Sequence, residues 1–321
     1  NNLRRVVFFL LATNLGEILT LAAALVIGLD LPLTAVMVLW VKHNTARIFI
    51  SDDLKHWEMA SDFESPGFFE CPDLFELPVE GQTDSTKWII HDASFRYCIG
   101  DFDGRRFVAE TELIQGEFGS NFYAAQTWNN LPGRRVQIGW MRGGVYPEMP
   151  FNQQLSFPCT LTLRNTVDGL RIHRMPVAGI SSLYEEKAFE GSITLNKDPR
   201  KITEGSLFDI RLETQWQADM DFCVRCYGKE IRYSAVSEQL TCMNSTATVK
   251  ARDGLVDLRI LVDHTSIEVF ANGGLVVMSF CFIPETETTP LELCSENGSL
   301  DVRSLSVFKL RSIHKHPTRS Q

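Results

Sequence analysis

Residues 255–274 read LVDLRILVDHTSIEVFANGG, and this stretch decides the fold class of the chain. Apolar side chains alternate with polar ones in its first half, where Asp257 and Arg259 lie between aliphatic residues. A period of two is typical of a half-buried β-strand. The alternation resumes in residues 266–270, and Asn272-Gly273-Gly274 supplies the turn that follows. The stretch therefore predicts two half-buried strands.

Working outward, the same pattern predicts a β-sandwich with strands from about Ser192 to Val307. Residues 48–176 contain a second set of short runs rich in Val, Ile, Phe and Thr, as in a β-propeller. The pattern breaks between Pro176 and Glu190. We therefore expect an all-β chain with one domain at residues 42–178 and a second at residues 190–313.

Composition agrees with two soluble β domains. The 321 residues are long for one domain, and a hydrophobic content of 44% is ample for a core. The net charge is −9 and the chain has no basic block, so we expect no nucleic-acid partner.

The eight cysteines do not predict a metal site. Cys223 and Cys226 form a CxxC, but they lie in an apparent strand, where residues three apart face opposite sides. Neither a second CxxC nor a nearby pair of histidines completes a zinc site. We expect buried free thiols, no metal and no cofactor, while the even count leaves disulfides open.

The segment FECPDLF, residues 69–75, contains the strongest candidate for chemistry. Pro72 restricts its own φ and favours an extended conformation for Cys71, so Glu70 is expected on a rigid strand or turn. Phe69 and Cys71 disfavour the charged form of Glu70, which suits a general acid. The alternative is a surface turn with a solvated acid.

Further short motifs follow FECPDLF in a set order. They are YCIGDFDG (97–104), FGSNFYAAQTW (118–128), IGWM (138–141), MPFNQQLSFPCTLTLR (149–164) and DHTSIEVFANGG (263–274). In this order and spacing, the set resembles glycoside hydrolase family 32, which comprises invertases, levanases, inulinases and fructan β-fructosidases. The resemblance covers residues 48–313 and implies a five-bladed β-propeller followed by a β-sandwich.

The resemblance also implies a reaction and a set of site residues. It implies a retaining glycosidase acting on levan, inulin or sucrose, with Glu70 as acid/base. Trp140, in IGWM, matches a tryptophan that lines the sugar pocket, and Tyr123 matches a hydrogen-bond donor at the pocket rim. Asn121 lies near the fructose site, and Asp73 is expected to orient Glu70, to bind sugar or to have a structural role.

Two motifs of the family are missing from this sequence. The nucleophile belongs to a WMNDPNG-like motif and a further aspartate to an Arg-Asp-Pro motif, yet the chain contains neither NDPNG nor RDP. We therefore expect a propeller without its first blade and part of its second, which would mean an N-terminally truncated or divergent chain. Two functional classes stay open: a β-fructosidase, or an inactive fructan-binding or structural remnant.

Residues 1–41 are apolar and allow three interpretations. Arg4 and Arg5 before an apolar run indicate a secretory signal or anchor. A membrane span is the second, but Glu17 and Asp30 leave only 12 uninterrupted residues, against the ~20 that a span needs. The third is a truncated or misjoined reading frame with residues 36–41 serving as a propeller strand. We expect a secreted or cell-envelope protein, with a cytoplasmic location as the alternative.

Overall fold

The computed structural model describes residues 35–147 and 149–313, and this part of the chain is built from antiparallel β-strands. Its one helical element is a 3₁₀-helix at Ala178–Leu183. The described residues include no helix of the length and apolarity that a membrane crossing requires. The all-β prediction is therefore confirmed.

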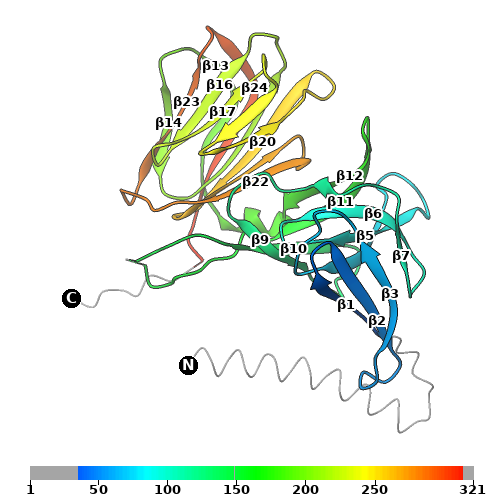
Figure 1. The fold of residues 1–321 in the computed structure, drawn as a ribbon. Coiled ribbons are helices and arrows are strands. Elements are labelled where there is room, and N and C mark those ends of the chain that lie inside the picture. The colour runs from blue at the N-terminus through cyan, green and yellow to red at the C-terminus, as the bar shows by residue number, and fades with distance from the viewer. Residues whose placement is uncertain (1–34, 148, 314–321) are drawn as a thin grey trace.

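The first domain contains three separate antiparallel sheets that follow one another along the chain (Figure 1). The first sheet has β1 (Ala35–Lys42), β2 (Thr45–Ser51) and β3 (Glu58–Glu64). The second has β4 (Asp73–Pro78), β5 (Thr86–His91), β6 (Arg96–Phe102) and β7 (Phe107–Ala109), with β8 (Ile114–Gln115) paired to β6. The third has β9 (Phe122–Thr127), β10 (Arg135–Met141), β11 (Cys159–Thr166) and β12 (Gly169–Pro176).

The second domain is a sandwich of two six-stranded sheets. One has the order β13 (Tyr184–Leu195), β24 (Leu300–Leu310), β15 (Phe208–Gln215), β20 (Leu255–Val262), β21 (Ser266–Ala271), β22 (Val276–Cys281). The other has the order β14 (Arg200–Gly205), β23 (Thr289–Ser295), β16 (Asp221–Cys226), β17 (Lys229–Ser234), β18 (Gln239–Cys242), β19 (Ser245–Thr248). Their facing side chains form the largest apolar cluster described, which includes Ile260, Val269 and Leu293.

The strands expected at residues 255–262 and 266–270 are β20 and β21, and they pair antiparallel with each other. Their burial differs from the expectation. All six residues of β21 are buried, so the strand is not half-buried. The second face of β21 is covered because Phe270 packs in an apolar cluster with Cys159 of the first domain.

The second domain starts earlier than residue 190, because β13 begins at Tyr184 and pairs with β24. The reason lies in the burial of β13. It is the outer strand of its sheet, and residues 185–187 are all exposed, so the sequence there shows no apolar alternation.

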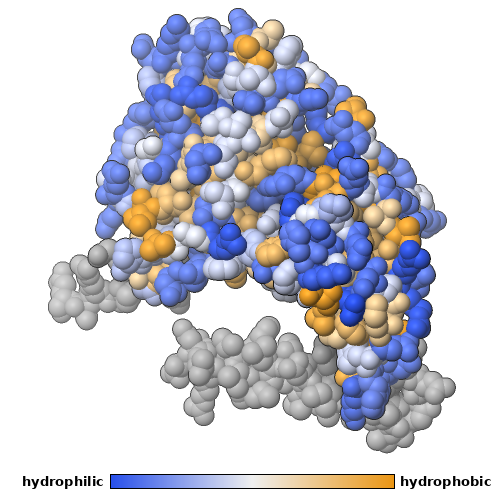
Figure 2. All heavy atoms as spheres, in the orientation of Figure 1, coloured by the Kyte–Doolittle hydropathy of each residue, from blue (hydrophilic) through white to orange (hydrophobic). Residues whose placement is uncertain are grey.

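The predicted apolar segment 1–41 lies partly outside the described residues, which begin at residue 35. Residues 35–41 belong to β1, so this part of the segment is a strand. Val36, Leu39 and Val41 are 40%, 42% and 41% exposed. Figure 2 shows hydrophobic side chains gathered over this sheet at the lower right. Among the described strands, β1 pairs only with β2, so its outer edge is open.

Candidate active site

Glu70 lies in the turn between β3 and β4, and the backbone of this turn is unusual. Glu70 has φ +54° and Cys71 has φ +40°, so both are in the left-handed region. The expectation of an extended Cys71 is therefore wrong. The turn is held from the neighbouring loop, because the Ala93 N–H approaches the carbonyl oxygens of Phe69 (3.2 Å) and Glu70 (3.0 Å). Each non-glycine residue in this region costs on the order of 1–3 kcal/mol, and such residues cluster at functional sites.

Tyr123 provides the hydrogen bond that orients the Glu70 side chain. Its hydroxyl donates to Glu70 Oε2 at 2.5 Å, although the two residues are 53 positions apart. The guanidinium carbon of Arg142 lies 4.2 Å from the centre of the Tyr123 ring. Burial, followed by the hydrogen bond to Glu70 and the charge of Glu70, raises the pKa of Tyr123 to about 12. The phenol therefore keeps its proton and remains a donor to the carboxylate.

Trp140 lies beside this pair. It is directly opposite Tyr123 in the register of β9 and β10, so the two side chains share one face of the sheet. The indole is half-buried, and its N–H donates to Gln153 Oε1 at 2.5 Å. The structure thus brings together three predicted site residues: a carboxyl group, a phenol and an indole.

Asp73 is close to the site but is occupied by protein partners. Its Oδ2 accepts from the backbone N–H (2.7 Å) and the hydroxyl (2.8 Å) of Thr127. Oδ2 also lies 3.6 Å from His91 Nε2. Burial would raise the pKa of Asp73, but the interaction with the nearby His91 ring and the hydrogen bonds from Thr127 outweigh burial and lower it. The carboxylate thereby joins β4 to β9, the strand that carries Tyr123.

Asn121 points toward the second domain. Its Nδ2 donates to the Arg142 carbonyl oxygen at 2.7 Å, and its Oδ1 accepts from the Cys281 N–H at 3.0 Å. Its amide therefore bridges the end of β10 and the sandwich strand β22. A direct contact with sugar stays a prediction for this residue.

Two residues near Glu70 were not predicted from the sequence. Asp92 is fully buried and opens the turn that contacts the Glu70 carbonyl. Its Oδ1 accepts from the N–H groups of Ser94 and Arg96, both at 3.0 Å. An aspartate before small residues between two strands is a turn signal that could have revealed it. Arg142 follows the IGWM motif, but nothing in its sequence context indicates that it covers Tyr123.

This arrangement can orient one carboxyl group toward a ligand that rests against an indole. A retaining glycosidase needs a second carboxylate about 5–5.5 Å from the first. Asp73 lies closest to Glu70 along the chain, but its Oδ2 is engaged with Thr127.

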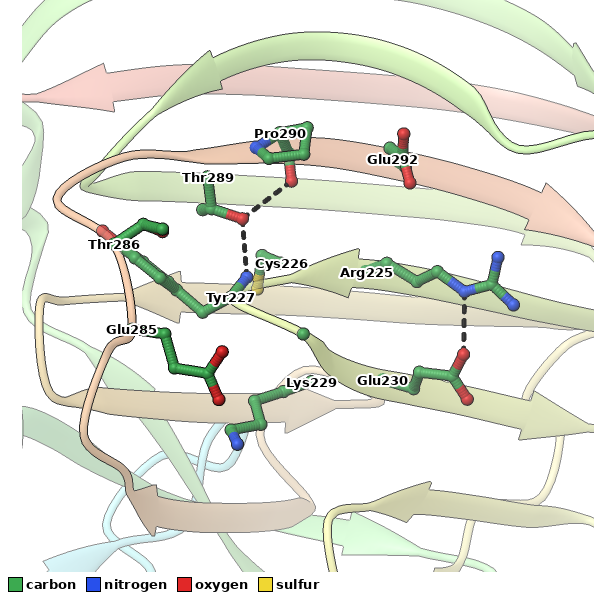
Figure 3. A pocket seen from close by; sticks show the side chains of 11 residues that line it. Arg225, Cys226, Tyr227, Lys229, Glu230, Glu285, Thr286, Thr289, Pro290 and Glu292 are labelled. Carbon is green, nitrogen blue, oxygen red and sulfur yellow. Dashed lines mark hydrogen bonds and ion pairs between the residues drawn. The ribbon is translucent and has the colours of Figure 1, made fainter.

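A separate cavity of about 410 Å³ lies in the second domain, next to the turn between β16 and β17 (Figure 3). Arg225 and Glu230 line it and are opposite each other on β16 and β17, where they form an ion pair with 2.8 Å between Nε and Oε1. None of the predicted site residues lines this cavity.

Comparison with known proteins places both domains in one family. The family model described as "Glycosyl hydrolases family 32 N-terminal domain" matches residues 33–174. The model described as "Glycosyl hydrolases family 32 C terminal" matches residues 180–309. The first matched region ends before the 3₁₀-helix at Ala178–Leu183, and the second begins within it.

Individual relatives agree with this match. The chain is 29% identical over 317 residues to a levanase of Bacillus subtilis, covering 83% of this chain and 47% of the relative. It is 25% identical over 321 residues to an extracellular exo-inulinase of Aspergillus ficuum, covering 83% of this chain and 60% of the relative. The chain thus spans only about half the length of these relatives.

Solved structures show the same fold. An exo-inulinase from Aspergillus awamori superposes with a TM-score of 0.75 at 22% identity, covering 84% of this chain and 63% of that one. A fructan 1-exohydrolase from Cichorium intybus superposes with a TM-score of 0.67 at 16% identity, covering 85% of this chain and 68% of that one. The first domain therefore has a propeller fold and the second the sandwich that accompanies it. The chain belongs to glycoside hydrolase family 32.

Proposed function

We propose that the chain forms the acid/base side of a retaining site for β-fructosides, with Glu70 as the acid/base. The observation that carries this proposal is the 2.5 Å hydrogen bond from the Tyr123 hydroxyl to the Glu70 carboxylate, with Trp140 opposite Tyr123 on the same face. Glu70 would protonate the leaving oxygen and then accept a proton from the attacking water. Trp140 would receive the apolar face of the sugar.

The substrates we propose are levan, inulin and sucrose. Support comes from relatives that are named levanase and exo-inulinase. One of these relatives is named extracellular, which supports a secreted or cell-envelope location. Substrate binding by Asn121 and Asp73 belongs to this proposal as well, although both side chains already have protein partners.

A second candidate is a protein that holds fructan without cleaving it. The sequence contains neither NDPNG nor RDP, so the nucleophile of the family's motif is missing. A covalent fructosyl intermediate cannot form without a nucleophile. For this polypeptide we expect no fructose release above a blank from sucrose, inulin or levan.

One experiment separates the candidates. Fructose release and calorimetric binding are measured on all three sugars for the full chain and for Glu70→Gln, Trp140→Ala and the control Glu76→Gln. Glu76 is an exposed acid on β4, six residues from Glu70. A hydrolase would lose about 10²–10⁴-fold of its turnover in Glu70→Gln and none in Glu76→Gln.

Binding without release would support the second candidate, provided that Trp140→Ala weakens binding roughly tenfold. Release that is equal in wild type and Glu70→Gln would reject the acid/base assignment. The absence of both binding and release would overturn both candidates.

A further inference from the structure

Residues 117–121, which lead into β9, run along the open edge of the sandwich strand β22. β22 is the last strand of its sheet, so its outer backbone groups have no strand partner there. The Phe118 N–H donates to the Val277 carbonyl at 2.8 Å, and the Asn121 N–H donates to the Ser279 carbonyl at 3.2 Å. A segment of the first domain thus forms hydrogen bonds with the edge strand of the second domain's sheet, as an added strand would.

Glu117 holds this segment against β22 through buried, charge-assisted hydrogen bonds. Its side chain is only 2% exposed and forms an ion pair with Arg174, which is equally buried. Its Oε1 accepts from the N–H groups of Ser279 (2.7 Å) and Gly119 (2.9 Å), and its Oε2 accepts from the Ser279 hydroxyl (3.2 Å). Breaking a buried pair of this kind is strongly destabilising, so residues 117–119 are held rigidly against β22.

Gly119 permits the close approach. A Cβ atom at this position would lie 2.1 Å from the nitrogen and 2.4 Å from the carbonyl oxygen of Ser279. Both neighbours are backbone atoms, which cannot move aside like the end of a side chain. Any larger residue at position 119 must therefore push the segment away from β22.

Asn121 links residues 117–121 to the candidate site. It lies two residues before Tyr123, and its Oδ1 accepts from the Cys281 N–H of β22. Its Nδ2 donates to the carbonyl oxygen of Arg142, whose guanidinium covers the Tyr123 ring at 4.2 Å. The Asn121 side chain therefore connects β22 with the start of β9, which carries Tyr123, and with Arg142, which covers the Tyr123 ring.

We infer that the edge strand β22 of the sandwich sets the position of Tyr123, and through it of Glu70. Glu117, Gly119 and Asn121 are then positioning residues, although none of them touches Glu70. The inference rests on the proposed role of Glu70. It gives the second domain a part in positioning the side chains of the site.

The test follows the Tyr123 ring directly and needs no turnover. The full chain is labelled with ¹³C at the tyrosine ζ carbon, which gives one signal for each of the six tyrosines. Tyr123→Phe identifies the signal of interest at pH 7. Glu70→Gln then shows how that signal moves when the carboxylate partner is lost.

We expect Gly119→Ala and Asn121→Leu to move the Tyr123 signal in the same direction as Glu70→Gln. Asn121→Asp keeps the oxygen that accepts from the Cys281 N–H, so its signal should lie closer to the wild-type position. The matched control is His173→Leu, which removes a different interdomain hydrogen bond, from His173 Nδ1 to the Gly273 carbonyl at 3.1 Å. This control should leave the Tyr123 signal in place.

The outcomes are distinct. A folded Asn121→Leu variant with a wild-type Tyr123 signal overturns the inference. If Gly119→Ala does not fold, the Tyr123 signal of Asn121→Leu alone tests the inference. If Glu70→Gln itself leaves the signal unchanged, the contact between Tyr123 and Glu70 fails, and the inference fails with it. If the signals move as expected while no fructan binds, the positioning is supported and the proposed function fails.

Discussion

At the scale of single residues, Glu268 has an unusual environment for a charged residue on a β-strand. Its side chain is fully buried between the two domains. It faces the carboxylate of Glu117, the guanidinium of Arg174 and the Ser279 hydroxyl, which lies 3.4 Å from Oε2. Burial raises the pKa of Glu268 to about 8, despite the opposing hydrogen bond from the Phe157 N–H at 2.7 Å.

Glu268 therefore makes folding stability depend on pH. The folded protein keeps this proton up to about pH 8, whereas the unfolded chain releases it near the ordinary value of 4.5. Stability from this group is complete below the ordinary value and is lost as pH rises through about 8. Within this window the loss has a slope of up to about 1.4 kcal/mol per pH unit.

We predict that Glu268→Gln flattens the fall of stability between the ordinary pKa of 4.5 and about pH 8, because glutamine has no proton to release. Glutamine also keeps an oxygen for the Phe157 N–H. Urea unfolding midpoints at several pH values measure the effect, and Glu76→Gln, at an exposed position, serves as the control. Identical pH slopes in wild type and Glu268→Gln would contradict the prediction.

At the scale of elements, β1 is an edge strand with exposed apolar side chains in the part of the chain that the structure describes. Its outer edge has no partner among the described strands, and Val36, Leu39 and Val41 are each about two-fifths exposed. An open, apolar edge strand is a template for pairing with another chain. The sheet β1-β2-β3 is therefore the place where self-association should start.

We predict that the full chain self-associates and that Val36→Lys with Leu39→Lys reduces this association, because charges on an edge strand oppose pairing. Light scattering against concentration measures it. Val167→Lys is the control, since Val167 is 97% exposed but lies in the turn between β11 and β12. Equal scattering from the double variant and wild type would place the association elsewhere.

At the scale of the whole molecule, the two domains behave as one packing unit. Phe270 and Val277 of the sandwich share an apolar cluster with Cys159 of the first domain and with Ile180 of the connecting 3₁₀-helix. Buried polar contacts between Glu117 and Ser279 lie beside this cluster. We therefore expect both domains to unfold in a single transition.

We predict that Phe270→Ala lowers stability by about 3–5 kcal/mol and separates the transition into two, because it opens a cavity between the domains. Phe222 is as fully buried but belongs to the core of the sandwich. Phe222→Ala should lower the midpoint of one transition without dividing it. Calorimetry distinguishes these results, and a single transition in Phe270→Ala would show that the domains stay coupled without the Phe270 side chain.

The sequence by itself determined the all-β class, the order of the two domains and the family. These conclusions depend on local patterns, namely apolar alternation, turn residues such as Asn272-Gly273-Gly274, and short motifs in order. Such patterns are visible because neighbouring residues in a strand alternate between its two faces. The tryptophan of IGWM was selected through the family resemblance, and the glutamate of FECPDLF through both its apolar neighbours and that resemblance.

Only the tertiary structure decided what covers each face and which residues meet. Alternation indicates that one face of β21 is apolar, but the first domain buries the other face as well. Glu70 and Tyr123 are 53 residues apart, and Glu117 and Ser279 are 162 apart. Contacts over such separations depend on how the sheets pack. The local sequence of a strand specifies which side chains lie on each face, but not which other part of the chain packs against that face.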